Sequence, residues 1–420
     1  MNYTKFFSKM SLLRQPSPIR SLAPLLKLPG MISLAGGLPN PLSFPFESCT
    51  FNLKDGSQIS LDKAAMSIAL QYSPSEGIAD LYEVLKSHQI EKHSLVDRQD
   101  WNIIITSGSQ DALTKAFEML LDPGEDAVLV ENPTYTGALA ALHPLQPEMI
   151  EVPIDANGII PEELERVITE YKGAKKIKFL YTIPTGQNPS GASLTVDRKK
   201  KILEIAEKFD FLVLEDDPYF YLNLVEKENI NDKTDSDVTM LSMDGSGRVL
   251  RFDSLSKVLS SGIRIGWCTG PSPLIQRIHL HQQANSLHTS GLSQGVTAAL
   301  LNEWGQDGLT QHVAKVQELY RKQRDMFVKS VEKHLKGYVE YSVPTAGMFL
   351  WMKLIGVEDS KSFIEEKARE KKVLMVPGQA FQPNDKPGPY VRASFSVEGQ
   401  ENMDLACERL AELLKENRKN

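Results

Sequence analysis

Residues 251–267 read Arg-Phe-Asp-Ser-Leu-Ser-Lys-Val-Leu-Ser-Ser-Gly-Ile-Arg-Ile-Gly-Trp, and the interpretation of the whole chain starts from this stretch. The apolar residues around its first position predict a short strand. Two hydroxyl residues, Ser254 and Ser256, follow the strand and precede the single lysine Lys257. A Ser-Ser-Gly bend then leads to Arg264. The stretch therefore brings an amine, hydroxyls and a guanidinium together over a few residues.

This combination of groups fits a particular kind of site. A neutral lysine amine can form a Schiff base with an aldehyde, while hydroxyls and a guanidinium can hold a phosphate beside it. Pyridoxal phosphate carries both an aldehyde and a phosphate. A serine-rich surface turn with a solvated lysine is the alternative interpretation, because short motifs also match by chance. The rest of the chain has to decide between the two.

Bulk properties limit the class of protein. A chain of 420 residues predicts two or three domains, and its 41% hydrophobic and 24% charged residues are ordinary for a soluble globular protein. A net charge of -7 argues against a general nucleic-acid binder, and no apolar run approaches the ~20 residues of a membrane helix. The scattered cysteines Cys49, Cys268 and Cys407 indicate a reducing compartment, with neither a disulfide framework nor a zinc pattern.

The N-terminus is basic. Serines and the five residues Lys5, Lys9, Arg14, Arg20 and Lys27 precede the first acidic residue of the chain. Such a leader is typical of a mitochondrial presequence, and an ordered arm that covers the active site is the alternative. Both interpretations hold if only a few residues are removed from the N-terminus. We expect the mitochondrial matrix, with the cytoplasm as the alternative; without a continuous apolar segment, a secretory signal is not expected.

Strand and helix signals alternate through the first half of the chain. The β-branched run 102–106 predicts a strand, and a Ser-Gly-Ser-Gln turn leads directly into a helix that ends near Leu121. Further strands are expected at 127–130, 149–153, 178–184 and 211–214, with helices at 161–171 and 195–209 between them. This alternation predicts an α/β fold with a mainly parallel sheet flanked by helices. In such sheets ligands bind beyond the carboxyl ends of the strands, which are followed here by Ser109, Tyr135, Asn188, Asp216 and Lys257.

The C-terminal part of the chain has a different secondary-structure pattern. Residues 271–336 read as largely helical, and residues 338–420 predict a second, smaller α+β domain. We expect three parts: an N-terminal arm with part of the small domain (1–47), a large cofactor-binding domain (48–300) and a small C-terminal domain (301–420). Polar residues 226–237 predict a solvated loop. No metal site is expected, because carboxylates and cysteines at ligand spacing do not accompany His279, His281 and His288.

The cofactor hypothesis assigns roles to the residues near the carboxyl ends of the predicted strands. A buried carboxylate, Asp216, would keep the pyridine nitrogen protonated, and Asp217 is the weaker candidate. Asn188 and Tyr219 would donate to the phenolate oxygen, and Tyr135 would stack on the ring. The phosphate would be held by Ser109, Gln110, Ser254, Ser256 and Arg264. An arginine fork suits a substrate carboxylate, and Arg392 lies in a predicted strand. An ordinary serine N-cap at Ser109 and a surface arginine at position 392 are the alternatives.

At this point several motifs match a known family. They include Asn2-Tyr3, Pro16–Arg20, Ile32–Pro41, Gln71–Ser75, Thr106–Gln110, Glu215–Tyr219, Ala346–Trp351 and Tyr390–Ser396. The chain resembles, nearly end to end, the fold-type I pyridoxal-phosphate aminotransferases of class I/II in the aspartate aminotransferase superfamily. Within this family it is most similar to the kynurenine/2-aminoadipate aminotransferases.

The resemblance implies specific roles. Lys257 is similar to the Schiff-base lysine that later moves a proton, Asp216 to the pyridinium partner and Arg392 to the α-carboxylate clamp. Tyr72 is similar to a tyrosine that reaches the phosphate across a dimer interface, which implies a homodimer with shared active sites. Substrate contacts are implied for Arg20, Gly37, Leu38, Tyr72, Tyr135, Asn188 and Arg392. The resemblance also implies a catalytic role for Tyr135. Cis peptides are implied before Pro133 and Pro189.

The activity implied by the resemblance is transamination. The amino group of L-2-aminoadipate, L-kynurenine and related amino acids would pass to 2-oxoglutarate. A broad aromatic and branched-chain aminotransferase and a lyase that cleaves Cβ–S bonds on the same fold are alternatives. A regulator fused to a DNA-binding domain is not expected, since the family pattern begins almost at residue 1. Ser190 replaces a usual threonine, and segments 226–237 and 294–301 diverge from the family pattern, which leaves the substrate range open.

Overall fold

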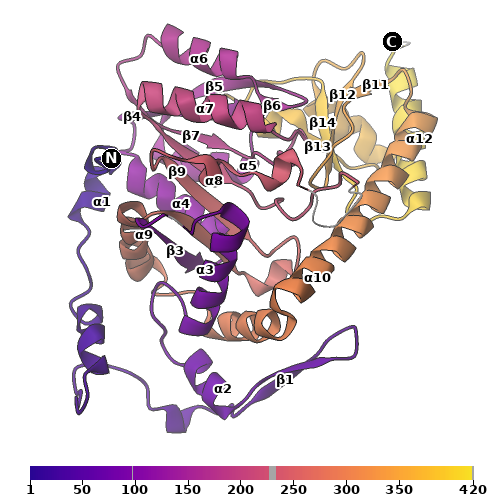
Figure 1. The fold of residues 1–420 in the computed structure, drawn as a ribbon. Coiled ribbons are helices and arrows are strands. Elements are labelled where there is room, and N and C mark those ends of the chain that lie inside the picture. The colour runs from indigo at the N-terminus through magenta and orange to yellow at the C-terminus, as the bar shows by residue number, and fades with distance from the viewer. Residues whose placement is uncertain (97, 227–232, 419–420) are drawn as a thin grey trace. The chain divides into compact units, whose positions relative to one another are not determined.

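The computed structural model of the chain is shown in Figure 1. It describes residues 1–96, 98–226 and 233–418, so part of the predicted loop at 226–237 lies outside the described residues. In this part of the chain, no helix combines the length and the apolar character that a membrane span requires.

Two compact units make up the chain. The first comprises Met1–Asp122 and Leu250–Thr310, and the second comprises Pro123–Val249 and Gln311–Asn420. These units are discontinuous in sequence, and their bounds differ from the three predicted parts. The division at residues 47 and 300 therefore stays a prediction.

The largest sheet has eight strands. Its hydrogen-bonded order is β3 (Trp101–Thr106), β10 (Gly266–Pro271), β9 (Val249–Ser254), β8 (Leu212–Asp216), β7 (Lys176–Thr182), β4 (Asp126–Asn132), β5 (Glu148–Asp155) and β6 (Gly158–Ile159). The pairs β5–β4, β4–β7 and β7–β8 are parallel, whereas β10 is antiparallel to both β3 and β9 and β6 is antiparallel to β5. The α/β fold with helices around a large sheet is confirmed, although the sheet is mixed at both edges. Strand β10 was not predicted, because its glycines and proline weaken the β-strand signal.

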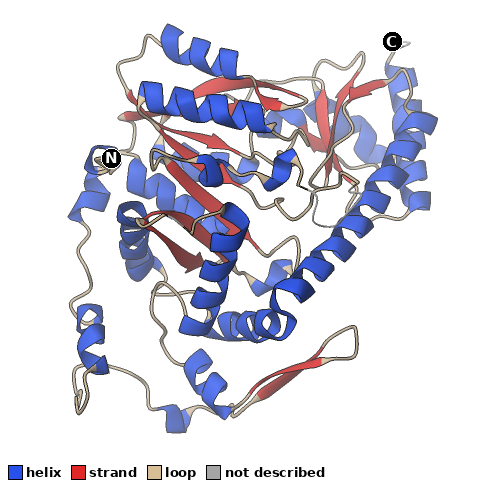
Figure 2. Cartoon of the chain, viewed as in Figure 1, coloured by secondary structure: helices blue, strands red, loops and turns tan. Residues whose placement is uncertain are grey.

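In the first unit, helices pack on the β3–β10 part of the sheet. They are α3 (Ala79–His93), α4 (Ser109–Leu120) and α9 (Ser272–Asn285), which lie close to these strands in Figure 1. The predicted inner face of α4, which includes Leu113 and Phe117, is buried. In sequence, the N-terminal arm is followed by a hairpin of β1 (Cys49–Asn52) and β2 (Gln58–Leu61), drawn as two red strands at the bottom of Figure 2, and then by α2 (Lys63–Leu70).

The first residues of the chain are anchored within the first unit. They form a short 3-10 turn, Thr4–Phe6, and the helix α1, Lys9–Leu13. The Phe6 ring is fully buried, and the Ser8 hydroxyl and amide donate to the carbonyls of Glu118 (2.8 Å) and Met119 (2.8 Å) in α4. Two further 3-10 segments, Arg20–Lys27 and Pro41–Ser43, follow in a stretch whose described side chains are mostly exposed.

The second unit holds the β8–β7–β4–β5–β6 part of the large sheet and a small sheet. The order of the small sheet is β11 (Val339–Tyr341), β12 (Phe349–Leu354), β14 (Tyr390–Ser394) and β13 (Val376–Pro377), with all pairs antiparallel. Its buried face, which includes Leu350, Met352 and Val391, shares a core with α12 (Gln400–Asn417). These elements match the α+β pattern expected for residues 338–420.

The remaining helices complete both units. In the second unit α6 packs against β5 and α7, and α7 packs against β8 and α8. Their bounds are α5 (Thr136–Leu142), α6 (Pro161–Glu170), α7 (Val196–Phe209), α8 (Met240–Met243), α10 (Gly291–His334) and α11 (Ser360–Ser362). Helix α10 is interrupted at Gly305, where φ is +58°, and α11 continues as the π-helical turn Phe363–Ala368.

Buried histidines on α3 make the stability of the protein depend on pH. Burial lowers the pKa of His88 to about 4 and that of His93 well below its usual value, with the Arg251 charge acting in the same direction. Near pH 5 the unfolded chain therefore binds a proton at His88 that the native state does not bind, so the free energy of unfolding falls as the pH decreases below about 6.5.

We expect this loss to be reduced by His88→Gln. Between pH 7 and pH 5 the wild type should lose about 2 kcal/mol more than the variant at this one site. Urea unfolding at both pH values measures the difference. The exposed His143 provides a matched control, and His143→Gln should follow the wild type. Equal slopes for His88→Gln and the wild type would contradict the assignment.

Candidate active site

The predicted site residues divide between the two units. The first unit holds Arg20, Gly37, Leu38, Tyr72, Ser109, Gln110, Ser254, Ser256, Lys257 and Arg264. The second unit holds Tyr135, Asn188, Asp216, Tyr219 and Arg392. Each group has its own geometry.

Groups that can bind an anion meet where β3 turns into α4. Gly108 caps the helix with φ +86°, and α4 begins at Ser109 as predicted. The Arg264 guanidinium spans this turn, because Nη2 donates to the Ser107 carbonyl (2.9 Å) and Nη1 donates to Ser256 Oγ (2.9 Å). A Cβ atom at Gly108 would collide with that guanidinium, so only glycine permits this approach.

Lys257 belongs to the same segment as Ser256, whose hydroxyl accepts from Arg264. Lys257 lies half-buried in the turn after β9, and Ser254 Oγ accepts from the Ser256 amide (3.2 Å). At the start of β10, a Cβ atom at Gly266 would lie 2.6 Å from the Ser109 amide nitrogen. The strand therefore passes directly beside the first turn of α4, whose free N–H groups favour an anion. The structure thus brings the predicted phosphate-binding residues to one helix N-terminus.

The remaining predicted residues of the first unit lie on or near the N-terminal arm. Arg20 Nη1 donates to the carbonyl of Ser73 (3.1 Å), the residue after Tyr72. The Tyr72 side chain is 54% exposed and meets His288 edge-on, with ring centroids 6.0 Å apart. Gly37 and Leu38 are exposed. The Gln71 side-chain amide donates to the carbonyl of Pro39 (3.0 Å), which brings the segment of Tyr72 next to that of Leu38.

The second group centres on Asp216 at the end of β8. Its carboxylate is buried, and Tyr181 from the neighbouring strand donates its hydroxyl to Oδ2 (2.7 Å). Burial and the Asp216 charge raise the pKa of Tyr181 well above its usual value, so the hydroxyl keeps its proton. Asp217 Oδ2 accepts from Thr185 Oγ1 (3.3 Å). Tyr181 was missed, because a tyrosine inside a strand signals only packing.

Asn188 and Arg392 form a second contact in this unit. Arg392 Nη1 donates to Asn188 Oδ1 (2.9 Å), and the guanidinium lies 4.1 Å from the Phe349 ring centroid and 5.0 Å from that of Phe381. The Arg392 Nε is buried and has no hydrogen-bond partner among the described residues. Burial lowers the pKa of Arg392, which stays a cation because its ordinary value is very high. A carboxylate would supply the missing acceptor.

Two tyrosines accompany this pair. Tyr219 is buried, and burial together with the charges of Tyr135 and Asp216 raises its pKa, so its phenol remains a donor near neutral pH. Tyr135 lies at the start of α5, where a Cβ atom at Gly137 would collide with its ring. The predicted cis peptides before Pro133 and Pro189 are confirmed.

Each group suits a different part of pyridoxal phosphate chemically. The first offers an amine beside hydroxyls, a guanidinium and a helix N-terminus, which is a donor set for a phosphate ester. The second offers a buried carboxylate held by a tyrosine, which suits a protonated ring nitrogen, and an arginine with an unfilled donor. A group of at least three histidine, cysteine or acidic residues suited to a metal does not occur in the described part of the chain.

Comparison with known sequences points in the same direction. Residues 44–410 match the model of the family "Aminotransferase class I and II". The chain is 46% identical to a mitochondrial kynurenine/alpha-aminoadipate aminotransferase of Mus musculus, with 99% of this chain and 100% of that protein covered. It is 45% identical to the protein of the same name from Bos taurus, with the same coverage.

Solved structures extend the comparison to the fold. An aminotransferase from Candida albicans matches 100% of this chain and 99% of its own chain, with a TM-score of 0.89 and 28% identity. A kynurenine aminotransferase from Pyrococcus horikoshii, solved with PMP, matches with a TM-score of 0.78 and 34% identity over 100% and 99% of the two chains. Family match, full-length relatives and site chemistry agree, and the chain is therefore a member of the class I and II aminotransferases, enzymes that work with pyridoxal phosphate.

Proposed function

We propose that this enzyme transfers the amino group of L-2-aminoadipate, L-kynurenine and related amino acids to 2-oxoglutarate. The full-length similarity to proteins named kynurenine/alpha-aminoadipate aminotransferase carries this proposal. A solved relative from Thermus thermophilus named alpha-aminoadipate aminotransferase, with a TM-score of 0.73 and 28% identity, supports the same substrate class.

Each of the proposed site residues has a separate role in this reaction. When bound, pyridoxal phosphate supplies an electron sink that stabilises negative charge at the substrate Cα. Lys257 takes the Cα proton and returns it, while Asp216, oriented by Tyr181, favours the proton on the ring nitrogen. Asn188 and Tyr219 would donate to the ring oxygen, and Tyr135 would pack on the ring. Ser109, Gln110, Ser254, Ser256 and Arg264 would hold the phosphate.

Arg392 is proposed as the clamp for the substrate α-carboxylate. Its aromatic surroundings exclude water from one side, and its buried Nε is the donor that a carboxylate oxygen would fill. A guanidinium that offers two parallel donors recognises a carboxylate with defined geometry, which orients the Cα–H bond for the proton transfer.

A homodimer with shared active sites is also proposed. Residues of the arm that are strongly apolar face solvent in the single chain, with Ile32 87%, Leu34 97% and Leu42 93% exposed. Such a contiguous apolar stretch is typical of a protein interface. Tyr72 and the loop at Gly37 and Leu38 would then complete the site of the other subunit. Sedimentation should give twice the 46.9 kDa mass of one chain.

A mitochondrial location is proposed as well, because the relatives are named mitochondrial and the N-terminus of the chain is basic and free of acidic residues. The contacts of Phe6 and Ser8 with the first unit favour a mature protein that keeps these residues. Imaging of a C-terminally tagged chain and N-terminal sequencing of the protein recovered from mitochondria would test both parts.

Product analysis tests the reaction itself. Purified protein with pyridoxal phosphate and L-2-aminoadipate should form glutamate only when 2-oxoglutarate is present. Release of ammonia or of a cleaved side chain without an oxo acid would instead indicate the lyase chemistry. A panel of donors that includes aromatic and branched-chain amino acids separates the proposed preference from a broad one.

Arg20 provides a test of the substrate class. We expect Arg20→Ala to lower kcat/KM for L-2-aminoadipate about 10- to 100-fold, because a charged hydrogen bond to the distal carboxylate contributes about 1.5–3 kcal/mol. Alanine or another small neutral donor should lose much less. Steady-state kinetics with both donors gives the comparison, and Arg20→Lys serves as the control that keeps the charge. Equal losses for both donors would show that Arg20 supports the arm, through Ser73, and does not read the substrate.

A further inference from the structure

We propose that Glu131 is a positioning residue that acts through Gln187: together they fix the loop that presents Asn188 to Arg392, and so set the affinity for the substrate α-carboxylate. The proposal rests on the proposed role of Arg392 as the carboxylate clamp. All residues involved belong to the second unit. We call residues 183–194, which connect β7 to α7, the Asn188 loop.

Glu131 lies near the end of β4 and is fully buried. Its Oε1 accepts from Thr182 Oγ1 (2.6 Å), and its Oε2 accepts from the Ile183 amide (3.3 Å) and from Gln187 Nε2 (3.0 Å). These donors are the last residue of β7 and two residues of the Asn188 loop. One carboxyl group therefore connects the end of β4 to the neighbouring strand and to the loop that follows it.

Gln187 extends the hydrogen bonds of Glu131 into the Asn188 loop. Its Nε2 also donates to the Pro133 carbonyl (2.8 Å), and its Oε1 accepts from the Ser190 amide (2.8 Å) and the Ser190 hydroxyl (2.6 Å). The side-chain amide thus uses two donor and two acceptor positions, which is its full capacity. Since Asn188 lies between Gln187 and Ser190, this one amide fixes the backbone on both sides of the residue that contacts Arg392.

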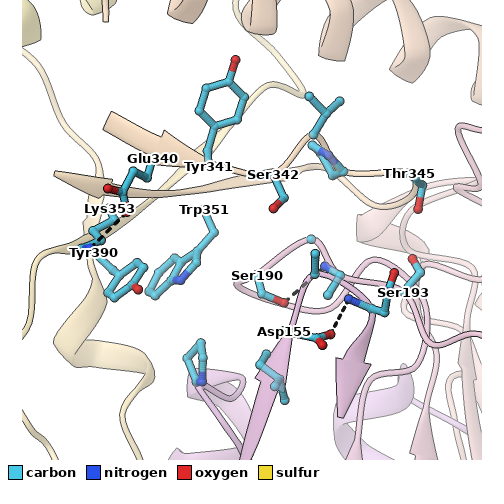
Figure 3. A pocket seen from close by; sticks show the side chains of 18 of the residues that line it. Asp155, Ser190, Ser193, Glu340, Tyr341, Ser342, Thr345, Trp351, Lys353 and Tyr390 are labelled. Carbon is cyan, nitrogen blue, oxygen red and sulfur yellow. Dashed lines mark hydrogen bonds and ion pairs between the residues drawn. The ribbon is translucent and has the colours of Figure 1, made fainter. Parts of the chain in front are cut away.

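The other side of the loop borders a cavity over part of its length. Ser190, Gly191, Ala192 and Ser193 line this cavity of about 710 Å³, together with Trp351 and other residues of the small sheet. Figure 3 shows Ser190 and Ser193 on one side of this cavity and Trp351 and Tyr390 on the other. The loop backbone also packs closely against residues 344–349 at Gly186 and Gly191, so the hydrogen bonds of Glu131 and Gln187 act mainly on the segment between these two glycines, which contains Asn188.

The proton on Glu131 fits this role. Burial, together with the nearby charge of Asp216, raises the pKa of Glu131 to about 7, although three hydrogen bonds act in the opposite direction. The titratable neighbours are Asp216 on β8 and Tyr181 on β7. A protonated Glu131 can donate to Thr182 Oγ1 and still accept from Ile183 and Gln187, so the brace persists without a second negative charge beside Asp216.

Glu131→Gln should therefore preserve the brace, because the glutamine amide can donate to Thr182 while its oxygen accepts from Ile183 and Gln187. Glu131→Ala and Gln187→Ala remove it. The matched control is Glu151→Ala, since Glu151 lies on the adjacent strand β5 and accepts from Asn132 Nδ2 (2.8 Å) but has no hydrogen bond to the Asn188 loop among the described residues.

The experiment measures the binding of glutarate, an unreactive dicarboxylate, to the holoenzyme, together with KM and kcat for L-2-aminoadipate at pH 6.5. We expect Glu131→Ala and Gln187→Ala to raise both the Kd for glutarate and the KM at least tenfold, with kcat changed less than threefold. Glu131→Gln and Glu151→Ala should stay within about twofold of the wild type. The affinity for pyridoxal phosphate should fall less than the affinity for glutarate in Glu131→Ala and Gln187→Ala, because Asn188 is only one of several residues proposed to hold the cofactor. It should be unchanged in Glu131→Gln and Glu151→Ala.

Two results separate the inference from the function on which it rests. Unchanged glutarate binding in folded Glu131→Ala or Gln187→Ala protein, with a large loss in Arg392→Leu, overturns the positioning role and leaves the clamp intact. Unchanged binding in Arg392→Leu overturns the clamp and the inference together. If Glu131→Ala does not fold, Gln187→Ala alone decides, because it leaves the Glu131 contacts with β7 in place.

Discussion

Replacing Lys257 with alanine is expected to abolish transamination, with kcat reduced by at least about 10⁴-fold. The half-buried Lys257 follows β9 directly and is the amine nearest in sequence to the Ser254, Ser256 and Arg264 cluster. Under the proposed roles, the variant would lose both the nucleophile that joins the cofactor and the base that moves the Cα proton. Alanine can perform neither task, because its side chain carries no amine.

The measurement has two parts. Glutamate formation from L-2-aminoadipate and 2-oxoglutarate reports turnover, and the change in visible absorption when pyridoxal phosphate is added to the apo-protein reports the covalent link. Both should be lost in Lys257→Ala. The exposed Lys54 in the β1–β2 hairpin gives the matched control, and Lys54→Ala should retain both signals. Activity of Lys257→Ala within tenfold of the wild type would overturn the assignment of the site.

The second large effect is expected from Asp216→Asn. An opposite charge within a few ångströms shifts a pKa by about 1–3 units, so loss of this carboxylate should reduce the protonated fraction of the ring nitrogen at neutral pH and lower kcat up to about 10³-fold. The substitution keeps the size of the side chain and an oxygen that can accept from Tyr181. The loss should therefore reflect the missing charge more than a change of packing.

The neighbouring carboxylate offers a stringent control for this prediction. Asp217 is also buried but accepts from Thr185, so Asp217→Asn should lower kcat less than tenfold. Tyr181→Phe should give an intermediate loss, because Asp216 keeps its charge but loses one orienting hydrogen bond. Steady-state kcat values for the three variants rank these effects. A larger loss in Asp217→Asn than in Asp216→Asn would reverse the assignment of the ring partner.

Local patterns in the sequence were sufficient for several elements. The β-branched run before Ser107 gave β3, the Ser-Gly-Ser turn gave the start of α4, and the residues around Lys257 gave the end of β9. In each case the signal lies within a few residues, because strand propensity, a glycine at positive φ and an N-terminal helix position are local properties. The hairpin β1–β2 also has a local signal in the sequence, since Asp55-Gly56 is typical of a hairpin turn.

Other features depend on contacts between distant residues. Strand β10 is weak in local propensity and exists because it pairs with both β3 and β9. Glu131 and Tyr181 look like ordinary strand residues in the sequence. Their importance follows only from the neighbours that the parallel register of β4, β7 and β8 gives them.

The sequence by itself determined the family and the cofactor, and it supplied the proposed site residues, because these depend on side-chain types in short motifs. Only the tertiary structure decided that Arg264 spans the turn before α4, that Tyr181 orients Asp216, and that Glu131 and Gln187 hold the Asn188 loop. The physical reason is that a hydrogen bond between residues far apart in the chain depends on strand register and burial, and neither is contained in the residues that form it.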